Sequence, residues 1–377
     1  MSLSRTNAVV ACMVGVAIGF GTGFSADSLE EKLRSDIIDH RLDNMPHIEA
    51  AFVLSGVTEQ DSLNRCLNRY LSILQTIRDY RFDSFDRIGS ANKVFQYLHS
   101  TWLRQYSKES TTLLDILQKK QYNCVSATIL FNLLCDDLGW TTEAFETPSH
   151  VYTVFCNFIQ KVMVENTSPM GFDIIQNLQK YSHFLLQFYP ENQALKIGLD
   201  RIYVYENSRG RPINNTELLG LLAYNRAYLA EKRGDFSSAY QLVLFAQQFN
   251  GDSRSNVDFE IKIFYQWGEA LFQKKNFEEA LNVYWRGLMR HPDVGDFRSN
   301  VRSSFLNGMI SAWNDKNWDR SIRMVQMVSG FDFLQEKDVQ NLESLFQHWR
   351  IFFTESGRNQ EAKDAERLFK TISQESK

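Results

Sequence analysis

Cys124 occupies the kind of position in which a reactive thiol is found, at the start of a predicted helix. Asn123 is a good N-cap residue, and Leu138 and Gly139 are typical of a helix end. The apolar face of this helix consists of Val125, Ile129, Leu133 and Leu134. Because the dipole and the unpaired N–H groups of a first turn favour a thiolate over a thiol, we expect Cys124 to be nucleophilic. The same N–H groups are expected to bind a developing oxyanion.

A nucleophilic cysteine needs a base, and the base needs an acceptor that orients it. His150 opens a predicted strand, which is expected to turn at residues 157–158 and to return to Glu165. In a hairpin with that turn, position 165 lies directly opposite position 150, so Glu165 is predicted beside His150. Asn166 is the neighbouring alternative, but its side chain is expected on the other face of the sheet.

Each of these residues alone has an ordinary structural interpretation. A cysteine in an apolar helix is more often a packed core residue, and Cys135 and Cys156 are interpreted in that way. A histidine at a strand start is commonly structural, and a glutamate at a strand end is commonly solvated. The order of helix cysteine, strand histidine and adjacent-strand carboxylate is more specific than any one of its members. Cys124, His150 and Glu165 are therefore the candidate catalytic triad.

The elements around the triad change in character along the chain. Residues 27–120 have mostly the three-and-four apolar spacing of packed helices. Three short segments rich in β-branched and aromatic residues then predict an antiparallel meander, with strands at 141–145, 151–155 and 161–164. Segment 202–205 is predicted to add one more strand, and region 172–187 is predicted to be helical.

From Asn215 onward the pattern is helical again, and it repeats. Small residues recur at a constant spacing of 41, at Ala239, Ala280, Ser321 and Ala362. Turn-like pairs keep the same register, at Gly234-Asp235, Lys275-Asn276, Lys316-Asn317 and Gly357-Arg358. A small residue after a turn lets two helices approach closely, and aromatic residues at other fixed positions fill the space between hairpins. The spacing therefore predicts an array of helical hairpins.

The second repeat resembles the tetratricopeptide pattern. The resemblance is carried by Phe264, Trp267-Gly268, Leu271, Phe277, Ala280, Tyr284 and Pro292. It covers about residues 220–372 as four helical hairpins. The period of 41 residues is longer than the usual tetratricopeptide unit of about 34 residues. What it implies is a helical array that binds a protein or peptide partner or presents a substrate.

The region of the triad resembles the transglutaminase-like branch of the papain-type cysteine superfamily. Three blocks carry the resemblance, which are Tyr122-Asn123-Cys124-Val125-Ser126, Thr147-Pro148-Ser149-His150-Val151 and Val164-Glu165-Asn166-Thr167-Ser168-Pro169-Met170-Gly171. They are similar to small bacterial members in which tetratricopeptide repeats follow this core, and the similarity covers about residues 95–215. The resemblance implies that Cys124 is the nucleophile, His150 the general base and Glu165 the orienting acid. Many members have aspartate in the third place, so Glu165 is a departure.

Length and composition fit two globular domains and argue against several classes of protein. The chain has 377 residues, of which 44% are hydrophobic and 23% charged. A net charge of −4 without a basic stripe gives no indication of a nucleic-acid partner. The cysteines that would remain after export lack metal-ligand spacing, so neither a metal nor a cofactor is expected. They are Cys66, Cys124, Cys135 and Cys156.

The N-terminus has the pattern of a targeting segment. Arg5 precedes an uncharged run from Thr6 to Ala26, whose centre is apolar and rich in glycine. This is typical of a secretory signal, with cleavage after Ala26 or after Gly23. An uncleaved membrane anchor is the alternative, because the run is about as long as the shortest membrane span. We therefore predict an exported protein, in the periplasm or the cell envelope.

Together these patterns predict an α+β domain, in which the cysteine helix packs on an antiparallel sheet, followed by an all-α array of helical hairpins. The expected boundaries are 1–26 for the signal or anchor, 27–215 for the transglutaminase-like domain and 216–372 for the four repeats. The predicted function is cysteine-dependent acyl transfer, as a peptidase, amidase or transamidase. The alternative is a non-catalytic protein-interaction scaffold with a degenerate transglutaminase-like core.

Overall fold

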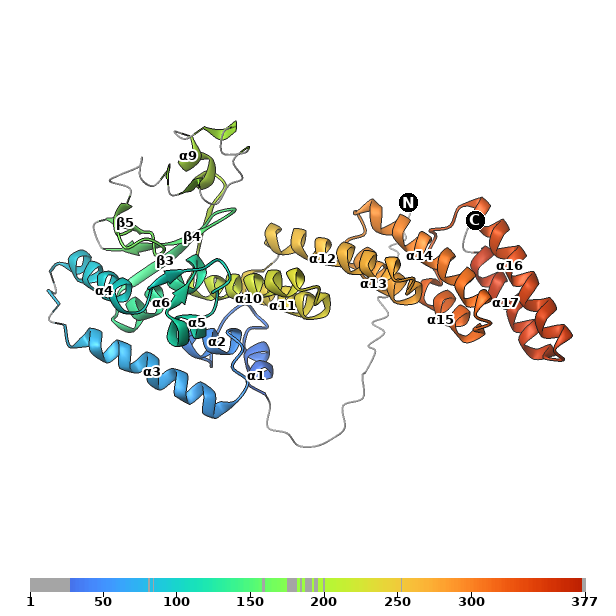
Figure 1. Ribbon diagram of the computed structural model, residues 1–377, viewed down its shortest axis with the longest axis horizontal. Coiled ribbons are helices and arrows are strands. Elements are labelled where there is room, and N and C mark those ends of the chain that lie inside the picture. The colour runs from blue at the N-terminus through green and yellow to red at the C-terminus, as the bar shows by residue number, and fades with distance from the viewer. Residues whose placement is uncertain are drawn as a thin grey trace, which may run out of the picture.

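The computed structural model describes residues 28–374 apart from 81, 84, 158–159, 175–181, 184, 187–191, 193–195, 199–200 and 252. The predicted signal or anchor at 1–26 lies outside the described residues, as does most of the predicted helical region 172–187. Figure 1 shows a part that combines helices with a sheet, and a row of paired helices that extends away from it. The prediction of an α+β part followed by a C-terminal helical array is confirmed at this level.

The chain before the sheet is mostly helical, as predicted. Its helices are α1 (Leu29–Asp36), α2 (His47–Leu54), α3 (Gln60–Arg78), α4 (Arg87–Thr101), α5 (Leu113–Lys119) and α6 (Cys124–Asp137). On α3 the buried residues follow the spacing of an amphipathic helix. They are Leu63, Tyr70, Ile73, Leu74 and Ile77. On α6, in contrast, every residue from Val125 to Cys135 is buried, which makes it the central helix of the α+β part.

The main sheet is antiparallel and contains the three strands predicted between residues 141 and 164. Its strands are β3 (Thr141–Glu146), β4 (Val151–Cys156), β5 (Lys161–Val164) and β6 (Arg211–Ile213), in the order β5-β4-β3-β6. Alternate residues of β4 point to opposite faces. Val151 and Phe155 pack in the same core as α6, whereas Tyr152 packs on the other face against Met163 and Ile202.

The strand predicted at 202–205 is wrong, because this segment is helix α9 (Ile202–Asn207). Ile202 and Glu206 are fully buried, and their spacing of four places both on one face of a helix. A strand would have buried Val204 together with them, but Val204 is 62% exposed. The fourth strand is β6 instead, at the edge of the sheet, where Pro212 is tolerated because an edge strand has N–H positions that need no partner.

The C-terminal array consists of four helical hairpins with the predicted period. Its helices are α10 (Asn215–Lys232), α11 (Phe236–Asn250), α12 (Arg254–Gln273), α13 (Phe277–Arg290), α14 (Gly295–Asn314), α15 (Trp318–Val328), α16 (Glu336–Glu355) and α17 (Asn359–Gln374). Each predicted turn joins the two helices of a hairpin. The first residue of each turn has a positive φ, and these residues are Gly234, Lys275, Lys316 and Gly357. The small residues that recur after the turns are buried, as close helix packing requires.

The first hairpin of the array packs directly on the α+β part. Leu218, Leu222 and Phe249 of α10 and α11 belong to the same hydrophobic core as α6 and the sheet, and Figure 1 shows these two helices beside α5 and α6. The core of the remaining hairpins begins at Ala227. Helix α10 therefore connects the two parts of the molecule through contacts with both.

The described residues include no helix with the length and apolar character that a membrane span requires.

Candidate functional site

Cys124 is held at the first turn of α6 by its neighbours on both sides. The two-residue strands β1 (Gln105–Tyr106) and β2 (Gln121–Tyr122) pair in parallel and lead the chain to the cysteine. Asn123 is the N-cap, as predicted, and its Oδ1 accepts hydrogen bonds from the N–H groups of Val125 at 3.0 Å and Ser126 at 3.1 Å. These two N–H groups are therefore occupied, and of the first-turn groups expected to bind an oxyanion they are not available. Within the described part of the chain, the N–H of Cys124 itself has no acceptor.

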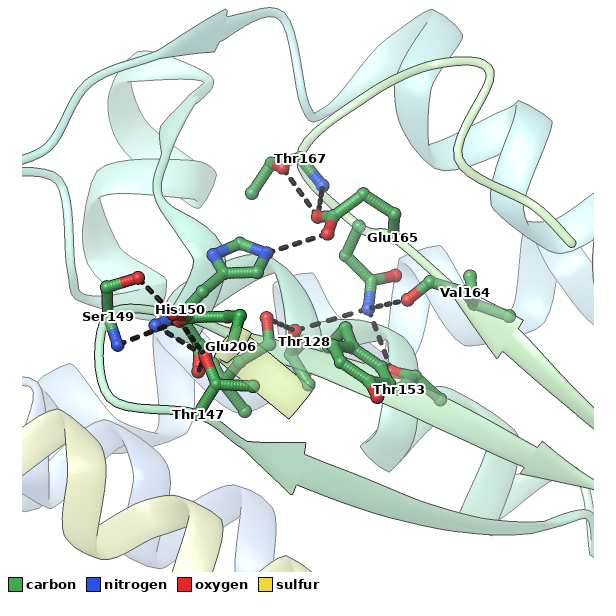
Figure 2. Close-up of polar contacts among 12 residues, drawn as sticks. Thr128, Thr147, Ser149, His150, Thr153, Val164, Glu165, Thr167 and Glu206 are labelled. Carbon is green, nitrogen blue, oxygen red and sulfur yellow. Dashed lines mark hydrogen bonds and ion pairs between the residues drawn. The ribbon is translucent and has the colours of Figure 1, made fainter. Parts of the chain in front are cut away.

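His150 lies at the start of β4 behind a turn that a buried carboxylate holds in place. His150 donates its backbone N–H to Thr147 Oγ1 at 3.1 Å, and its carbonyl accepts the N–H of Thr147 at 2.8 Å. Glu206 of α9 accepts hydrogen bonds from Thr147 Oγ1 at 2.5 Å and from the N–H and Oγ of Ser149 at 3.1 and 2.6 Å. Figure 2 shows Glu206 close to Thr147 and Ser149. The position of His150 thus depends on a residue from a distant segment.

Glu165 contacts the imidazole of His150 in a fully buried environment. Its Oε2 lies 2.7 Å from His150 Nε2, and both side chains are completely inaccessible to solvent (Figure 2). Its Oε1 accepts two hydrogen bonds from Thr167, from the N–H at 3.0 Å and from Oγ1 at 2.5 Å. The backbone N–H of Glu165 donates to Gly171, where a Cβ atom would overlap the Glu165 carbonyl oxygen. Residue 171 is therefore restricted to glycine by this close approach.

The predicted pairing of residue 165 directly opposite residue 150 is wrong. In the observed register Thr153 pairs with Val164. If the antiparallel pairing is continued by one residue, Glu165 lies opposite Tyr152. The turn is centred one residue later in the chain than predicted, and this shifts every pair by two residues. A shift of two preserves the face on which each side chain lies. Glu165 therefore still reaches His150, as a diagonal neighbour across the hairpin.

Asn166, the alternative acceptor, points away from His150 as predicted. Its Nδ2 donates to Thr153 Oγ1 at 2.8 Å and to Thr128 Oγ1 of α6 at 3.2 Å (Figure 2). Thr153 Oγ1 donates in turn to Asn132 Oδ1 at 2.5 Å, and Asn132 Nδ2 donates to Asn215 Oδ1 at 3.0 Å. This buried network links the sheet, α6 and the first helix of the array.

The two buried histidines of this region have opposite charge preferences. Burial by itself lowers the pKa of His150, but the charges of Glu165 and Cys124, with hydrogen bonds to both side chains, raise it to about 10. Burial lowers the pKa of His99 to about 4, since the charge of the nearby Glu165 offsets it only partly. The surroundings of His150 therefore favour its charged form, and those of His99 favour its neutral form.

The other described cysteines lack such an environment. Cys135 is fully buried in the core, as predicted, and burial raises the pKa of its thiol well above the ordinary value. Cys156 was predicted to be a core residue, but it ends β4 and is only half-buried. Burial also raises the pKa of Cys156 and of Cys66. Of these thiols, Cys124 alone has an imidazole as a hydrogen-bonding neighbour.

Two cavities meet at Cys124. One has a volume of about 180 Å³ and is also lined by His150 and Val151. The other has a volume of about 250 Å³ and is also lined by Tyr106 and Lys108. Cys124 therefore borders both spaces. Among the described residues no cluster of histidine, cysteine or acidic side chains has the geometry of a metal site.

Two of the residues that hold the site were missed in the sequence. Glu206 lies in the segment that was interpreted as a strand, and a helical interpretation would have placed it on the buried face with Ile202. Asn132 lies on α6 and showed no signal, because a single asparagine in an apolar helix has no distinctive pattern. No protein-family model matches the chain, and no curated protein matches it either. Function is therefore argued from this geometry.

Proposed function

We propose that the protein is a transglutaminase-like cysteine acyl-transfer enzyme that acts on amide substrates, with Cys124 as nucleophile, His150 as acid and base, and Glu165 as the orienting carboxylate. The observation that carries the proposal is the buried contact of 2.7 Å between His150 Nε2 and Glu165 Oε2, with Cys124 near enough to raise the pKa of the same imidazole. Such a chain of nucleophile, base and acceptor is the general arrangement of cysteine and serine acyl transfer.

In the first half of the proposed reaction Cys124 attacks as a thiolate. A bond forms between its sulfur and the carbonyl carbon of the substrate amide, and the carbonyl oxygen becomes an oxyanion. The N–H of Cys124 is the donor available for that oxyanion at this end of α6. The carbon–nitrogen bond then breaks, and His150 transfers its Nδ1 proton to the departing amine. The products are a thioester on Cys124 and a free amine.

In the second half, His150 acts as a base. Water or a second amine attacks the thioester carbon, its proton passes to His150, and the carbon–sulfur bond breaks to restore the thiolate. Glu165 accepts from Nε2 throughout, which leaves Nδ1 for the proton transfer and stabilises the imidazolium. The fully buried Glu165, held by Thr167, compensates for the desolvation of the positive charge. Attack by water gives hydrolysis, and attack by an amine gives transamidation.

The rest of the proposal concerns the two ends of the chain. The helical array, with its resemblance to tetratricopeptide repeats, would bind a protein or peptide partner or present the substrate. Residues 1–26 would direct export to the periplasm or cell envelope, either as a cleaved signal or as a membrane tether. Both parts follow from the patterns in the sequence.

The test is selective modification of Cys124. The full-length protein is treated at neutral pH with a limiting amount of iodoacetamide, and the modified cysteines are identified by peptide mass mapping. Cys124 should react at least about tenfold faster than the half-buried Cys66 and Cys156, because burial raises the pKa of those two thiols and neither has His150 as a neighbour. A His150→Ala variant should lose this preference, whereas a variant with His40, an exposed histidine, replaced by alanine should retain it.

A glutamine-containing peptide offered with a primary amine then tests the chemistry itself. An acyl adduct of the peptide on Cys124, seen by intact mass, supports the proposal. If Cys124 shows neither preferential alkylation nor an adduct, the acyl-transfer function is wrong and the non-catalytic scaffold remains. In that case Cys124→Ala should leave the capture of a partner by the array unchanged.

A further inference from the structure

The cleft that contains the proposed nucleophile has walls from two parts of the chain. Cys124 and His150 lie on the α+β side of the cavity of about 180 Å³. The opposite side is formed by residues of the first two repeats. They are Leu221, Tyr224 and Asn225 of α10 and Ser255 and Asn256 of α12. The array therefore contributes directly to the space in which a substrate would meet the thiol.

Asn256 is the member of this wall whose polar group is unsatisfied. Its side chain is only 1% exposed, and no acceptor pairs with its buried Nδ2 among the residues that the structure describes. Its backbone N–H is paired, since it donates to Ser253 Oγ at 3.2 Å. The neighbouring Asn225 differs, because its Nδ2 donates to Thr111 Oγ1 at 3.0 Å.

A buried amide donor without a partner is unusual, because it loses its hydrogen bonds with water and gains none in return. Such a group is expected where a ligand supplies the missing acceptor. Asn256 lines the same cavity as Cys124 and His150, so the ligand would lie against the proposed nucleophile. The cavity wall and the unpaired donor thus belong to the same residue.

The chemistry of the cavity favours a neutral acceptor over an anionic one. The lining of this cavity includes the apolar residues Val125, Val151 and Leu221, and the acidic residue Glu146. The cation nearest to Glu146, Arg211, is already paired with it at 2.9 Å. The charged form of His150, which also lines this cavity, is already paired with Glu165 at 2.7 Å. A bound carboxylate would therefore face Glu146 while both nearby cations are paired, whereas a carbonyl oxygen would meet the amide donor.

We propose that Asn256 is a substrate-binding residue, whose Nδ2 donates a hydrogen bond to a carbonyl oxygen of a carboxamide or peptide substrate in the cavity beside Cys124. The first two hairpins of the array are then part of the active site and select amide substrates. This inference rests on the proposed function of Cys124. It adds that recognition depends on a residue of the repeats.

Two thiol reagents separate recognition from reactivity. Iodoacetamide carries a carboxamide, whereas methyl methanethiosulfonate transfers a methylthio group that has no carbonyl. Asn256→Leu replaces the amide with an apolar side chain of similar volume. The rate of Cys124 modification by iodoacetamide should fall about tenfold in this variant, because the donor is lost, while the rate with methyl methanethiosulfonate stays within about twofold. Asn256→Ser, which keeps a donor, should recover part of the iodoacetamide rate.

The matched control is Asn307→Leu, the same substitution at an exposed position of α14 far along the array, and it should change neither rate. Equal losses with both reagents would contradict the inference, since Asn256 would then affect only the thiol or the fold, and so would an unchanged iodoacetamide rate. Failure of the proposed function gives a different result. In that case Cys124 of the unaltered protein reacts with methyl methanethiosulfonate no faster than Cys66.

Discussion

The site and the far end of the array are both well buried, but the forces that hold them differ. Around the site several of the buried side chains are polar and have specific partners. They include His150, Glu165, Asn166 and Glu206. In the array the largest buried side chains are aromatic. They include Phe264, Phe297, Phe305, Trp349 and Phe353, with many ring contacts between neighbouring helices.

This difference has consequences for how each region responds to change. A hydrogen bond depends on direction and on the identity of donor and acceptor, so one altered atom can disable the site while the fold survives. Apolar packing depends on filled volume, so the array should lose stability in proportion to the volume removed. The site should therefore be sensitive in function and the array in stability.

The largest effect is expected for Glu165→Gln. The substitution keeps the shape of the side chain but removes the charge that stabilises the imidazolium and raises the pKa of His150. The rate of turnover, once a substrate is known, should fall about 10²- to 10⁴-fold, the usual contribution of a working acid–base group, and the rate of Cys124 alkylation should fall about tenfold. Glu366→Gln, at an exposed position in α17, serves as the control and should leave the rate unchanged. Comparable rates in the two variants would show that Glu165 does not support the chemistry.

The second largest effect is expected for Trp349→Ala in α16. Trp349 is fully buried and contacts the rings of Trp313, Trp318 and Phe353, so its removal leaves a large cavity. The free energy of unfolding, measured by urea denaturation, should fall by about 3–5 kcal/mol for the transition that includes the array. The rate of Cys124 alkylation should stay within about twofold.

Ile351→Ala on the same helix is the matched control for Trp349. Ile351 is 49% exposed, so its truncation should change the free energy of unfolding by no more than about 0.5 kcal/mol. If Trp349→Ala slowed alkylation as strongly as Glu165→Gln, the site and the distant hairpins would be coupled, and the contrast between the two regions would fail.

The same difference explains what the sequence could predict. The array repeats its own pattern, so Gly234, Lys275, Lys316 and Gly357 could be aligned without knowledge of any distant contact, and each lies at a turn. The helix that begins at Cys124 could be predicted from neighbouring residues alone, since its N-cap and apolar face lie within one short segment. Elements defined by neighbours in the chain were therefore predictable.

The contacts that complete the site were only partly predictable. Glu165 was predicted beside His150 from the alternation of strand faces, and the error of two residues in register did no harm because the face was preserved. Glu206 was missed because its partner Ser149 lies 57 residues away and because its own segment is rich in β-branched and aromatic residues. Burial against the sheet overrides that local strand preference in α9.

The third prediction concerns pH and again separates the two regions. The pKa of His150 is about 10 in the folded protein, against an ordinary value of 6.5. Because the folded value is raised, the stability that this group contributes is fully present below about pH 6.5 and is lost as pH rises through about 10. The free energy of unfolding of the α+β part, measured in urea across this range, should fall more steeply in the unaltered protein than in His150→Gln.

Trp349→Ala provides the complementary control, since it retains His150 and should show the same pH slope as the unaltered protein at lower overall stability. Identical slopes for His150→Gln and the unaltered protein would mean that the imidazolium at His150 does not stabilise the fold.

The smallest effect, and the only gain, is expected for Lys275→Gly in the array. Lys275 has a φ of 60°, in the left-handed region, at a repeat position where the first and fourth hairpins have glycine. This conformation costs about 1–2 kcal/mol for a residue with a side chain, whereas the extra freedom of glycine in the unfolded chain costs about 0.4–1 kcal/mol. The substitution should therefore stabilise the array by about 0.5–1 kcal/mol, measured as an increased urea midpoint. Lys274→Gly is the matched control, since its φ of −78° suits any residue, and it should be destabilising. A loss of stability in both variants would show that the turn does not carry the strain inferred from its backbone.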